Sequence, residues 1–274
     1  MYWFLVMLKR NNKEIIFLVL FIITSLPFVL NLPSNDQAIL KDHELFDEKL
    51  STIRCVDDLV KYNDSITNSP TLDTLEFVEN LSKVVKMRFK HGLANYSLSD
   101  NWIAAMAGKL AWNHFAAIVN ADDILKHNVG LCSQQTIVFL QALKHSGIPA
   151  RSVGLGKKEG PGHFIAEVKY KGDWHTYDVS LEPDWSKVSI PHQSMQYYQA
   201  NRDSLFKIYQ SHMPIELFNA LMNTVDYGEI GKFPAKRMQL FHRTTQAVTI
   251  FLPYLFLFLF VKAYYKRRGS VNNN

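Results

Sequence analysis

Two long apolar runs dominate the hydrophobic pattern, one near each end of the chain. Residues 15–32 (IIFLVLFIITSLPFVLNL) and residues 244–261 (TTQAVTIFLPYLFLFLFV) each span eighteen positions without a charged side chain. A helix of about twenty apolar residues crosses the hydrocarbon core of a bilayer. The pattern therefore predicts two transmembrane helices, in segments 14–33 and 244–262.

Each run has an alternative interpretation. The first resembles a secretory signal peptide, but no small-x-small cleavage site precedes Ser34, and Pro33 crowds the expected position. The second could be a buried core helix, but its LFLFLF stretch leaves no polar face. An uncleaved anchor and a second span are therefore favoured. Pro27 and Pro253 are expected to kink the two helices without preventing them from spanning.

Between the runs, the pattern changes from helical to β-type. Residues 34–128 are predicted to be mainly helical, with apolar spacings of three and four over residues 40–60 and 72–89, and with a helix start at residues 69–71. Residues 102–119 are apolar and rich in alanine, which predicts a buried helix.

Residues 129–185 are predicted to form the core of the fold. A helix over residues 133–144 ends at the stop signals Gly147 and Pro149. Three short β-type runs follow, at residues 150–155, 163–170 and 174–179, and Lys171-Gly172 is the expected hairpin turn between the last two. Helices followed by an antiparallel sheet predict an α+β domain. Residues 186–243 are expected to form a helical stalk or cap before the second span.

Basic residues are concentrated in the two tails. The 274-residue chain has a formal net charge of +5, yet the three basic residues of segment 1–13 and the four of segment 262–274 account for the whole excess. Residues 14–261 carry 23 basic and 25 acidic side chains, a net charge of −2. This distribution argues against a nucleic-acid partner. An apolar fraction of 47% likewise excludes a disordered chain.

The same charges predict the orientation in the membrane. Basic residues precede the first run, whereas the segment after it is mostly acidic, so the positive-inside rule places the amino terminus in the cytoplasm. Two crossings return the carboxyl-terminal tail, residues 263–274, to the cytoplasm. Residues 33–243 are then an extracytoplasmic domain that is tethered at both ends.

Three residues of the middle section form a candidate catalytic group. Cys132 lies at the start of the predicted helix, where backbone N–H groups and the helix dipole stabilise a thiolate. His163 opens a strand, and Asp178 lies on the next one. A Lys171-Gly172 turn would pair Asp178 with Ile165 and put His163 and Asp178 on one face as diagonal neighbours.

Taken singly, each of these residues has an ordinary explanation, as a core cysteine, a surface histidine or a turn aspartate. Their order and local contexts together match the nucleophile, base and orienting carboxylate of thiol acyl transfer. The other cysteine, Cys55, could form a disulfide with Cys132 outside the membrane, which would silence the nucleophile. Cys55 lies in a helical pattern, so a buried free thiol is the simpler interpretation.

The segments GLCSQQTIVFLQALKHSGIPARSV and GHFIAEVKYKGDWHTYDVS resemble the transglutaminase-like superfamily. The marks of that family present here are Gly130, Cys132, Gly147 to Arg151, Gly162 with His163, Trp174 and Asp178. The resemblance is close over about fifty residues and looser over residues 90–185. It implies a papain-like α+β core in which Cys132 is the nucleophile, His163 the base and later acid, and Asp178 the residue that holds the imidazole.

The family resemblance also implies an oxyanion hole. One donor is the backbone N–H of Cys132, and a second comes from an upstream side chain, for which Trp102, Trp112 and Asn113 are alternatives. Cross-linking members of the family bind calcium, but the sequence shows no EF-hand-type or other dense acidic loop, so we expect no metal and no cofactor.

The leading hypothesis is therefore a membrane-anchored thiol enzyme, a cysteine-dependent amide hydrolase or acyltransferase. Its substrate would be a peptide or protein amide, and the acyl group would pass to water or, in cross-linking, to an amine. The alternative is a non-catalytic transglutaminase-like module for binding or assembly in an envelope complex. A structural membrane protein that carries the motif by chance is the least favoured interpretation.

Overall fold

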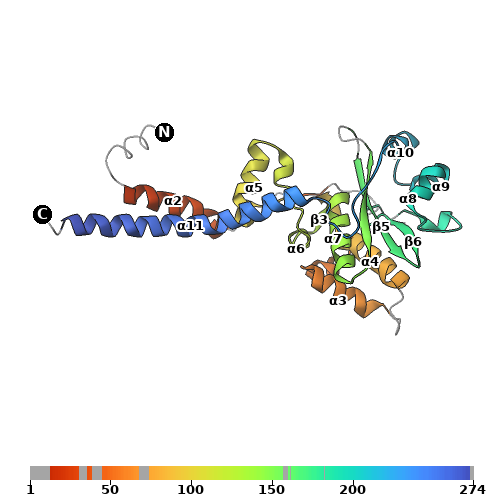
Figure 1. Cartoon of the computed structure of the whole chain (residues 1–274), viewed down its shortest axis with the longest axis horizontal. Coiled ribbons are helices and arrows are strands. Elements are labelled where there is room, and N and C mark those ends of the chain that lie inside the picture. The colour runs from red at the N-terminus through yellow and green to blue at the C-terminus, as the bar shows by residue number, and fades with distance from the viewer. Residues whose placement is uncertain are drawn as a thin grey trace. The chain divides into compact units, whose positions relative to one another are not determined.

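The computed structural model describes residues 13–30, 36–38, 45–67, 74–156, 160, 162–181 and 183–271 (Figure 1). The chain divides into two compact units. Unit 1 comprises Met1–Asn35, Asn95–Ala117 and Arg237–Asn274, and unit 2 comprises Asp36–Ala94 and Ile118–Lys236. The expected helix start at residues 69–71 and nearly all of the amino-terminal tail lie outside the described residues.

Unit 1 contains the two apolar helices, α2 (Lys13–Leu30) and α11 (Lys236–Val271). Both are long and apolar enough to cross a membrane, and only 11% of the apolar window of each is buried. A core helix of a soluble protein would be mostly buried, so that alternative for the second run is not supported. Within this unit, Glu14 of α2 forms an ion pair with Arg267 of α11, which brings the first turn of one helix beside the last turns of the other.

The alanine-rich stretch forms a shorter helix than the sequence predicts. The sequence predicts a helix over residues 102–119, but α5 (Leu98–Leu110) ends nine residues earlier and a short 3₁₀ turn, η2 (Asn113–Phe115), follows. The chain folds back so tightly that a Cβ on Gly108 would lie 2.6 Å from Cβ of Ala116. Only glycine allows this close approach, so the helical pattern is broken by a tertiary contact.

Unit 2 is built on a four-stranded antiparallel sheet in the order β6-β5-β4-β7. Its strands are β4 (Ala150–Gly156), β5 (Gly162–Tyr170), β6 (Asp173–Tyr177) and β7 (Val225–Tyr227). The predicted α+β class and the first three strands are confirmed. The fourth strand lies in a segment for which the sequence predicts only helices.

The hairpin between β5 and β6 has the predicted register. Tyr170 pairs with Asp173, and both turn residues have positive φ, 52° at Lys171 and 91° at Gly172. Two residues with positive φ give the type I′ turn, whose twist matches that of the flanking strands. Because the turn is as predicted, the following pairs are in the expected register as far as Ala166 and Tyr177, where the pairing ends.

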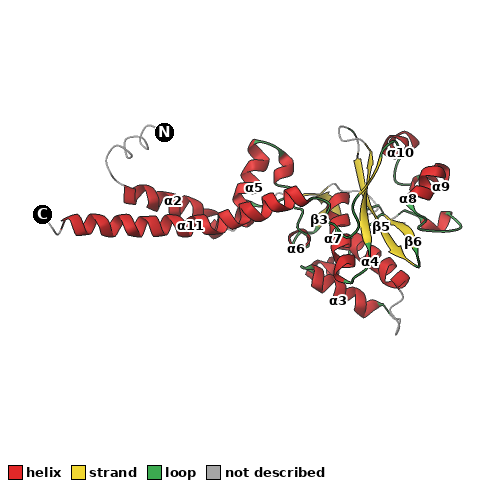
Figure 2. Ribbon diagram, in the orientation of Figure 1, coloured by secondary structure: helices red, strands yellow, loops and turns green. Residues whose placement is uncertain are grey.

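Helices cover both faces of this sheet (Figure 2). On one side lie α3 (Val56–Ile66), α4 (Thr74–Arg88), α6 (Ala121–Ile124) and α7 (Cys132–His145), with the 3₁₀ turn η1 (Glu48–Thr52). On the other lie α8 (Met195–Ala200), α9 (Arg202–Tyr209), α10 (Ile215–Met222) and the 3₁₀ turn η3 (Trp185–Lys187). We call α8, α9 and α10 the cap helices. They form an apolar core with Val153, Leu155 and Ile165 of the sheet.

A second, smaller sheet was not expected in the helical first half. It joins β1 (Gln37–Ala38), β2 (Lys90–Leu93) and β3 (Val129–Gly130), with an antiparallel first pair and a parallel second pair. Its strands have two to four residues and alternate too briefly to be recognised from sequence. Its role is positional, because β3 leads directly into α7.

An ion pair and its neighbouring rings connect all four strands of the sheet to the cap. Arg151 on β4 contacts Glu167 on β5 with an N–O distance of 2.6 Å, and the Glu167 side chain is fully buried. The guanidinium carbon lies 4.3 Å from the ring centroids of both Trp174 and Tyr227. The second carboxylate oxygen accepts a hydrogen bond from the backbone N–H of Met195, the first residue of α8. Arg151 and Trp174, two residues that carry the family resemblance, thus belong to one group of contacts that holds the sheet and the cap together.

We predict that Arg151→Met will lower the free energy of unfolding by about 3–5 kcal/mol, because it leaves the buried Glu167 carboxylate without a counter-ion. Denaturant unfolding of the detergent-solubilised protein measures this. Lys61→Met, which breaks the exposed pair with Asp57, is the control and should have little effect. Equal losses of unfolding free energy in the two variants would contradict a stabilising role for the buried ion pair.

Candidate active site

Cys132 is the first residue of α7, and the chain before it is held by close packing. A Cβ on Gly130 would lie 3.1 Å from Cγ of Gln135 and 3.4 Å from the ring of Phe89, so a larger residue would displace these neighbours. As the first residue of the helix, Cys132 has a backbone N–H without an acceptor inside the helix. The helix dipole adds a positive potential at this position.

A buried glutamine fixes the start of α7. The side-chain amide of Gln134 donates to the carbonyls of Ala94 and Ile118, at 2.8 Å each. Its oxygen accepts from the N–H groups of Ala94 (3.0 Å) and Leu131 (3.2 Å). All four hydrogen-bonding positions of the amide are therefore used, and three separate segments are joined next to the thiol.

The histidine is brought to the thiol by a contact between α7 and β5. The hydroxyl of Thr136, one turn into α7, donates to the carbonyl of Phe164 at 2.9 Å. His163 precedes Phe164 on β5, and its ring lies close enough to the Cys132 thiol for each group to shift the pKa of the other. On the other side, Nε2 of His163 lies 2.6 Å from Oδ2 of Asp178. Since Nε2 faces the carboxylate, Nδ1 is the nitrogen left for sulfur.

Asp178 is a fully buried carboxylate with every lone pair engaged. Its Oδ1 accepts from the N–H of Ser180 (3.0 Å), the hydroxyl of Ser180 (3.0 Å) and the N–H of Leu181 (3.1 Å). Its Oδ2 accepts from His163 and, at 2.8 Å, from the hydroxyl of Tyr209. The side chain has no exposed surface, so the carboxylate is oriented by protein atoms alone.

The three groups shift one another's protonation equilibria. Burial opposes ionisation of the Cys132 thiol, but the hydrogen bond and positive charge of His163, together with the N–H of Phe164, outweigh it and lower the thiol pKa below its ordinary value. Burial likewise opposes the imidazolium, yet the charge of Asp178 and its hydrogen bond raise the pKa of His163 to about 10. The pKa of Asp178 falls well below its usual range for the reciprocal reason, despite burial. These directions favour a thiolate–imidazolium pair over a neutral thiol and a neutral imidazole.

The structure brings together all three residues that the sequence singled out. The strand pairing ends at Ala166 and Tyr177, so Asp178 lies one residue beyond β6 and is not paired with Ile165 on the strand as the sequence predicts. Its carboxylate nevertheless reaches the ring of His163. Cys55 lies elsewhere in unit 2, at the N-cap of α3. Its sulfur accepts a hydrogen bond from the backbone N–H of Asp58 at 3.4 Å. Both cysteines are free thiols in the structure, so the disulfide alternative is not supported.

The three alternatives for the second oxyanion donor, Trp102, Trp112 and Asn113, all belong to unit 1, whereas Cys132 belongs to unit 2. Trp112 is half exposed. The indole nitrogen of Trp102 is buried and has no hydrogen-bond partner in the described part of the chain. The second donor stays a prediction.

Sequence reasoning did not find three of the residues that shape the site. Ser180 could have been found, because a serine two residues after an aspartate is a common partner in an Asx-type turn. Gln134 carries a weaker signal as a polar residue in the first turn of a buried helix. Tyr209 carries none, since it lies 31 residues from Asp178 on the buried face of an amphipathic helix.

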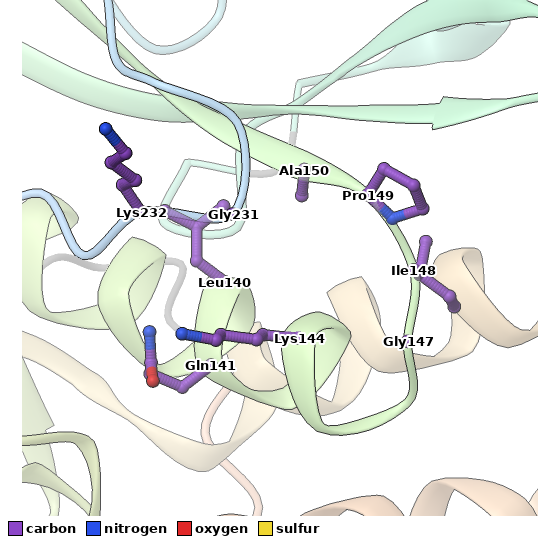
Figure 3. Close-up of a pocket in the computed structure, with 9 residues that line it drawn as sticks. All are labelled: Leu140, Gln141, Lys144, Gly147, Ile148, Pro149, Ala150, Gly231 and Lys232. Atoms are coloured by element: carbon purple, nitrogen blue, oxygen red, sulfur yellow. The ribbon is translucent and has the colours of Figure 1, made fainter.

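A cavity of about 230 Å³ lies at the other end of α7 (Figure 3). It is lined by Leu140, Gln141 and Lys144 and by the loops at residues 147–150 and 231–232. At least eight residues of helix separate it from Cys132, about 12 Å along the axis. It is therefore distinct from the site. Among the residues that the structure describes, no three His, Cys, Asp or Glu side chains are grouped to hold a metal ion.

Residues 61–179 match the family model of the transglutaminase-like superfamily. This part of the chain is a transglutaminase-like domain. The match includes Cys132, His163 and Asp178 and ends before the cap helices. A solved structure described as "Crystal structure of a TGase" is 17% identical, with a TM-score of 0.33 over 56% of this chain. The chain spans about a third (35%) of the length of that protein. No curated protein matches the chain.

The charge pairing in the transglutaminase-like domain predicts selective alkylation of Cys132. Iodoacetamide reacts with thiolates, so Cys132, whose pKa is lowered, should be labelled at a lower pH than Cys55, whose pKa is raised. Mass spectrometry of labelled peptides across a pH series measures both sites in one sample.

His163→Asn tests the cause of that difference. It removes the hydrogen bond and the positive charge but keeps the burial, so labelling of Cys132 should shift to higher pH while labelling of Cys55 stays unchanged. Unchanged labelling of Cys132 would show that the imidazole does not activate this thiol.

Proposed function

We propose that this protein is a membrane-anchored thiol enzyme that cleaves or transfers amide acyl groups outside the cytoplasm. One observation carries the proposal: the buried Asp178 carboxylate binds the His163 ring at 2.6 Å, and this ring lies close enough to the Cys132 thiol to lower its pKa. Transglutaminase-like domains commonly catalyse cysteine-dependent acyl transfer or hydrolysis, which agrees with this arrangement.

In the proposed reaction, the Cys132 thiolate attacks the carbonyl carbon of the amide and forms a carbon–sulfur bond. The oxygen of the tetrahedral intermediate carries the negative charge, and the backbone N–H of Cys132 is the donor placed to stabilise it. His163 gives its proton to the leaving amine as the carbon–nitrogen bond breaks, which leaves a thioester.

A second nucleophile then resolves the thioester. Water or an amine attacks the thioester carbonyl, His163 accepts the proton of the nucleophile, and the thiolate leaves. Asp178 stays ionised throughout and stabilises the imidazolium whenever it forms. Water gives amide hydrolysis, whereas a primary amine gives cross-linking. The substrate is proposed to be a peptide or protein amide.

The non-catalytic alternative is not favoured. A module kept only for binding or assembly does not need a thiol with a lowered pKa beside an oriented imidazole, and such groups are typical of catalytic sites. Complementation of a deletion strain by a Cys132→Ser chain would reverse this preference.

The charge pattern and unit 1 together support a two-pass arrangement. The Glu14–Arg267 pair puts the beginning of α2 beside the end of α11, as expected when both termini lie on one side of a bilayer. Basic tails next to these ends favour the cytoplasmic side. We therefore propose cytoplasmic termini and an extracytoplasmic domain.

Cys132→Ala is expected to abolish turnover, with a loss of about 10⁶-fold. Asp178→Asn, which keeps the size of the side chain, should cost about 10⁴-fold. The assay incubates the purified protein with a glutamine-containing protein, with and without a fluorescent primary amine, and measures released ammonia and incorporated amine. Cys55→Ser is the matched control and should retain activity. Full activity of Cys132→Ala would refute the proposal that this protein is a thiol enzyme.

Protease protection tests the orientation. In sealed right-side-out vesicles, tags fused to the two termini should resist added protease, whereas residues 33–243 should be cleaved. Detergent should make both tags accessible, which controls for their intrinsic resistance. Loss of either tag in sealed vesicles, or separation of the amino-terminal tag by signal peptidase, would contradict the two-pass arrangement.

A further inference from the structure

The two oxygens of Asp178 are held in different ways. Among the described residues, Oδ1 is bonded only by the adjacent turn, through Ser180 and Leu181. Oδ2, the oxygen that faces His163, shares its second position with the hydroxyl of Tyr209 at 2.8 Å. The local turn alone would hold one oxygen and leave the other to the imidazole. Tyr209 is thus the contact from outside the hairpin that defines the direction of Oδ2.

The hydroxyl of Tyr209 lies in an apolar core, where it would destabilise the fold if it had no hydrogen-bond acceptor. Its side chain is 2% exposed and lies in the apolar core of the cap with Leu205, Ile208 and Phe218. A buried hydroxyl without an acceptor is strongly destabilising, and phenylalanine would fill the same space without that requirement. Burial and the charge of Asp178 raise the pKa of Tyr209 well above its ordinary value, so the hydroxyl stays protonated and remains a donor.

The cap covers the face of the sheet that carries the imidazole. Side chains alternate along β5, so His163, Ile165 and Glu167 share one face. Ile165 lies in the core cluster with Tyr209, and Glu167 accepts from the first residue of α8. The segment 186–243, which the sequence presents as a stalk or cap, therefore contacts the hairpin at both ends of this face.

We propose that Tyr209 is a positioning residue of the catalytic site, which fixes the Asp178 carboxylate so that it holds His163 against Cys132. Tyr209 lies beyond the family match at residues 61–179, so the helical cap of this chain completes the triad. This proposal rests on the proposed function, and its test uses a readout that needs no substrate.

The experiment is a double-mutant cycle on the full-length protein. The rate constant for iodoacetamide alkylation of Cys132 at pH 6 is measured for wild type, Tyr209→Phe, Asp178→Asn and the double variant. Tyr209→Phe should slow alkylation about ten- to a hundredfold, the value of a hydrogen bond to a charged group. In the Asp178→Asn background the same change should alter the rate by no more than about twofold.

Tyr198→Phe is the matched control. Tyr198 belongs to the same core and is 1% exposed, but its hydroxyl accepts from the N–H of Gln193. In the part of the chain that the structure describes, no hydrogen bond joins this hydroxyl to Asp178. Its alkylation rate should equal that of wild type. An unchanged rate for Tyr209→Phe, or an equal loss in both backgrounds, would overturn the positioning role.

Folding of each variant is checked by thermal unfolding. If Tyr209→Phe does not fold but the double variant does, the hydroxyl is needed only for the buried carboxylate, which supports the proposal. If neither folds, the tyrosine is needed for packing and the proposal fails. Turnover by Cys132→Ala is a separate result. It would refute the proposed enzymatic function, whatever the alkylation experiment shows about Tyr209.

Discussion

The buried negative charge of Asp178 is the constraint on which the site depends. A carboxylate without exposed surface is unstable unless protein donors replace its hydration and a cation lies beside it. The donors here come from three places: the turn after β6, the ring of His163 and the hydroxyl of Tyr209. The hairpin and the cap must therefore both be in place before the imidazole is oriented and the Cys132 thiol is activated.

A second buried carboxylate plays the matching structural role at the other end of the same face. Glu167 is neutralised by Arg151 and accepts a hydrogen bond from the start of α8, while Asp178 accepts one from the end of α9. Ile165 lies between them in the apolar core. The cap is held on the sheet by one charged contact at each end and by apolar packing in between. Its position is thereby coupled to the geometry of the site.

Hydrogen bonds to backbone groups near the thiol also fix the geometry of the site. Gln134 satisfies four backbone groups from three segments, and Thr136 joins α7 to the carbonyl beside His163. These contacts hold the first turn of α7 and the first residues of β5 at a fixed spacing. A thiol and an imidazole on separate elements can exchange a proton only if that spacing is maintained.

Local patterns in the sequence determined the two apolar helices, the α7 helix, the β5–β6 hairpin and, through its two-residue turn, the face shared by His163 and Asp178. These features depend on periodicity and turn chemistry within about twenty residues. Only the tertiary structure decided the end of α5, the strand β7, the small sheet before α7 and the bond from Tyr209. Each of these results from the approach of distant segments, such as Ala116 packing on Gly108, and no local pattern records which segments will meet.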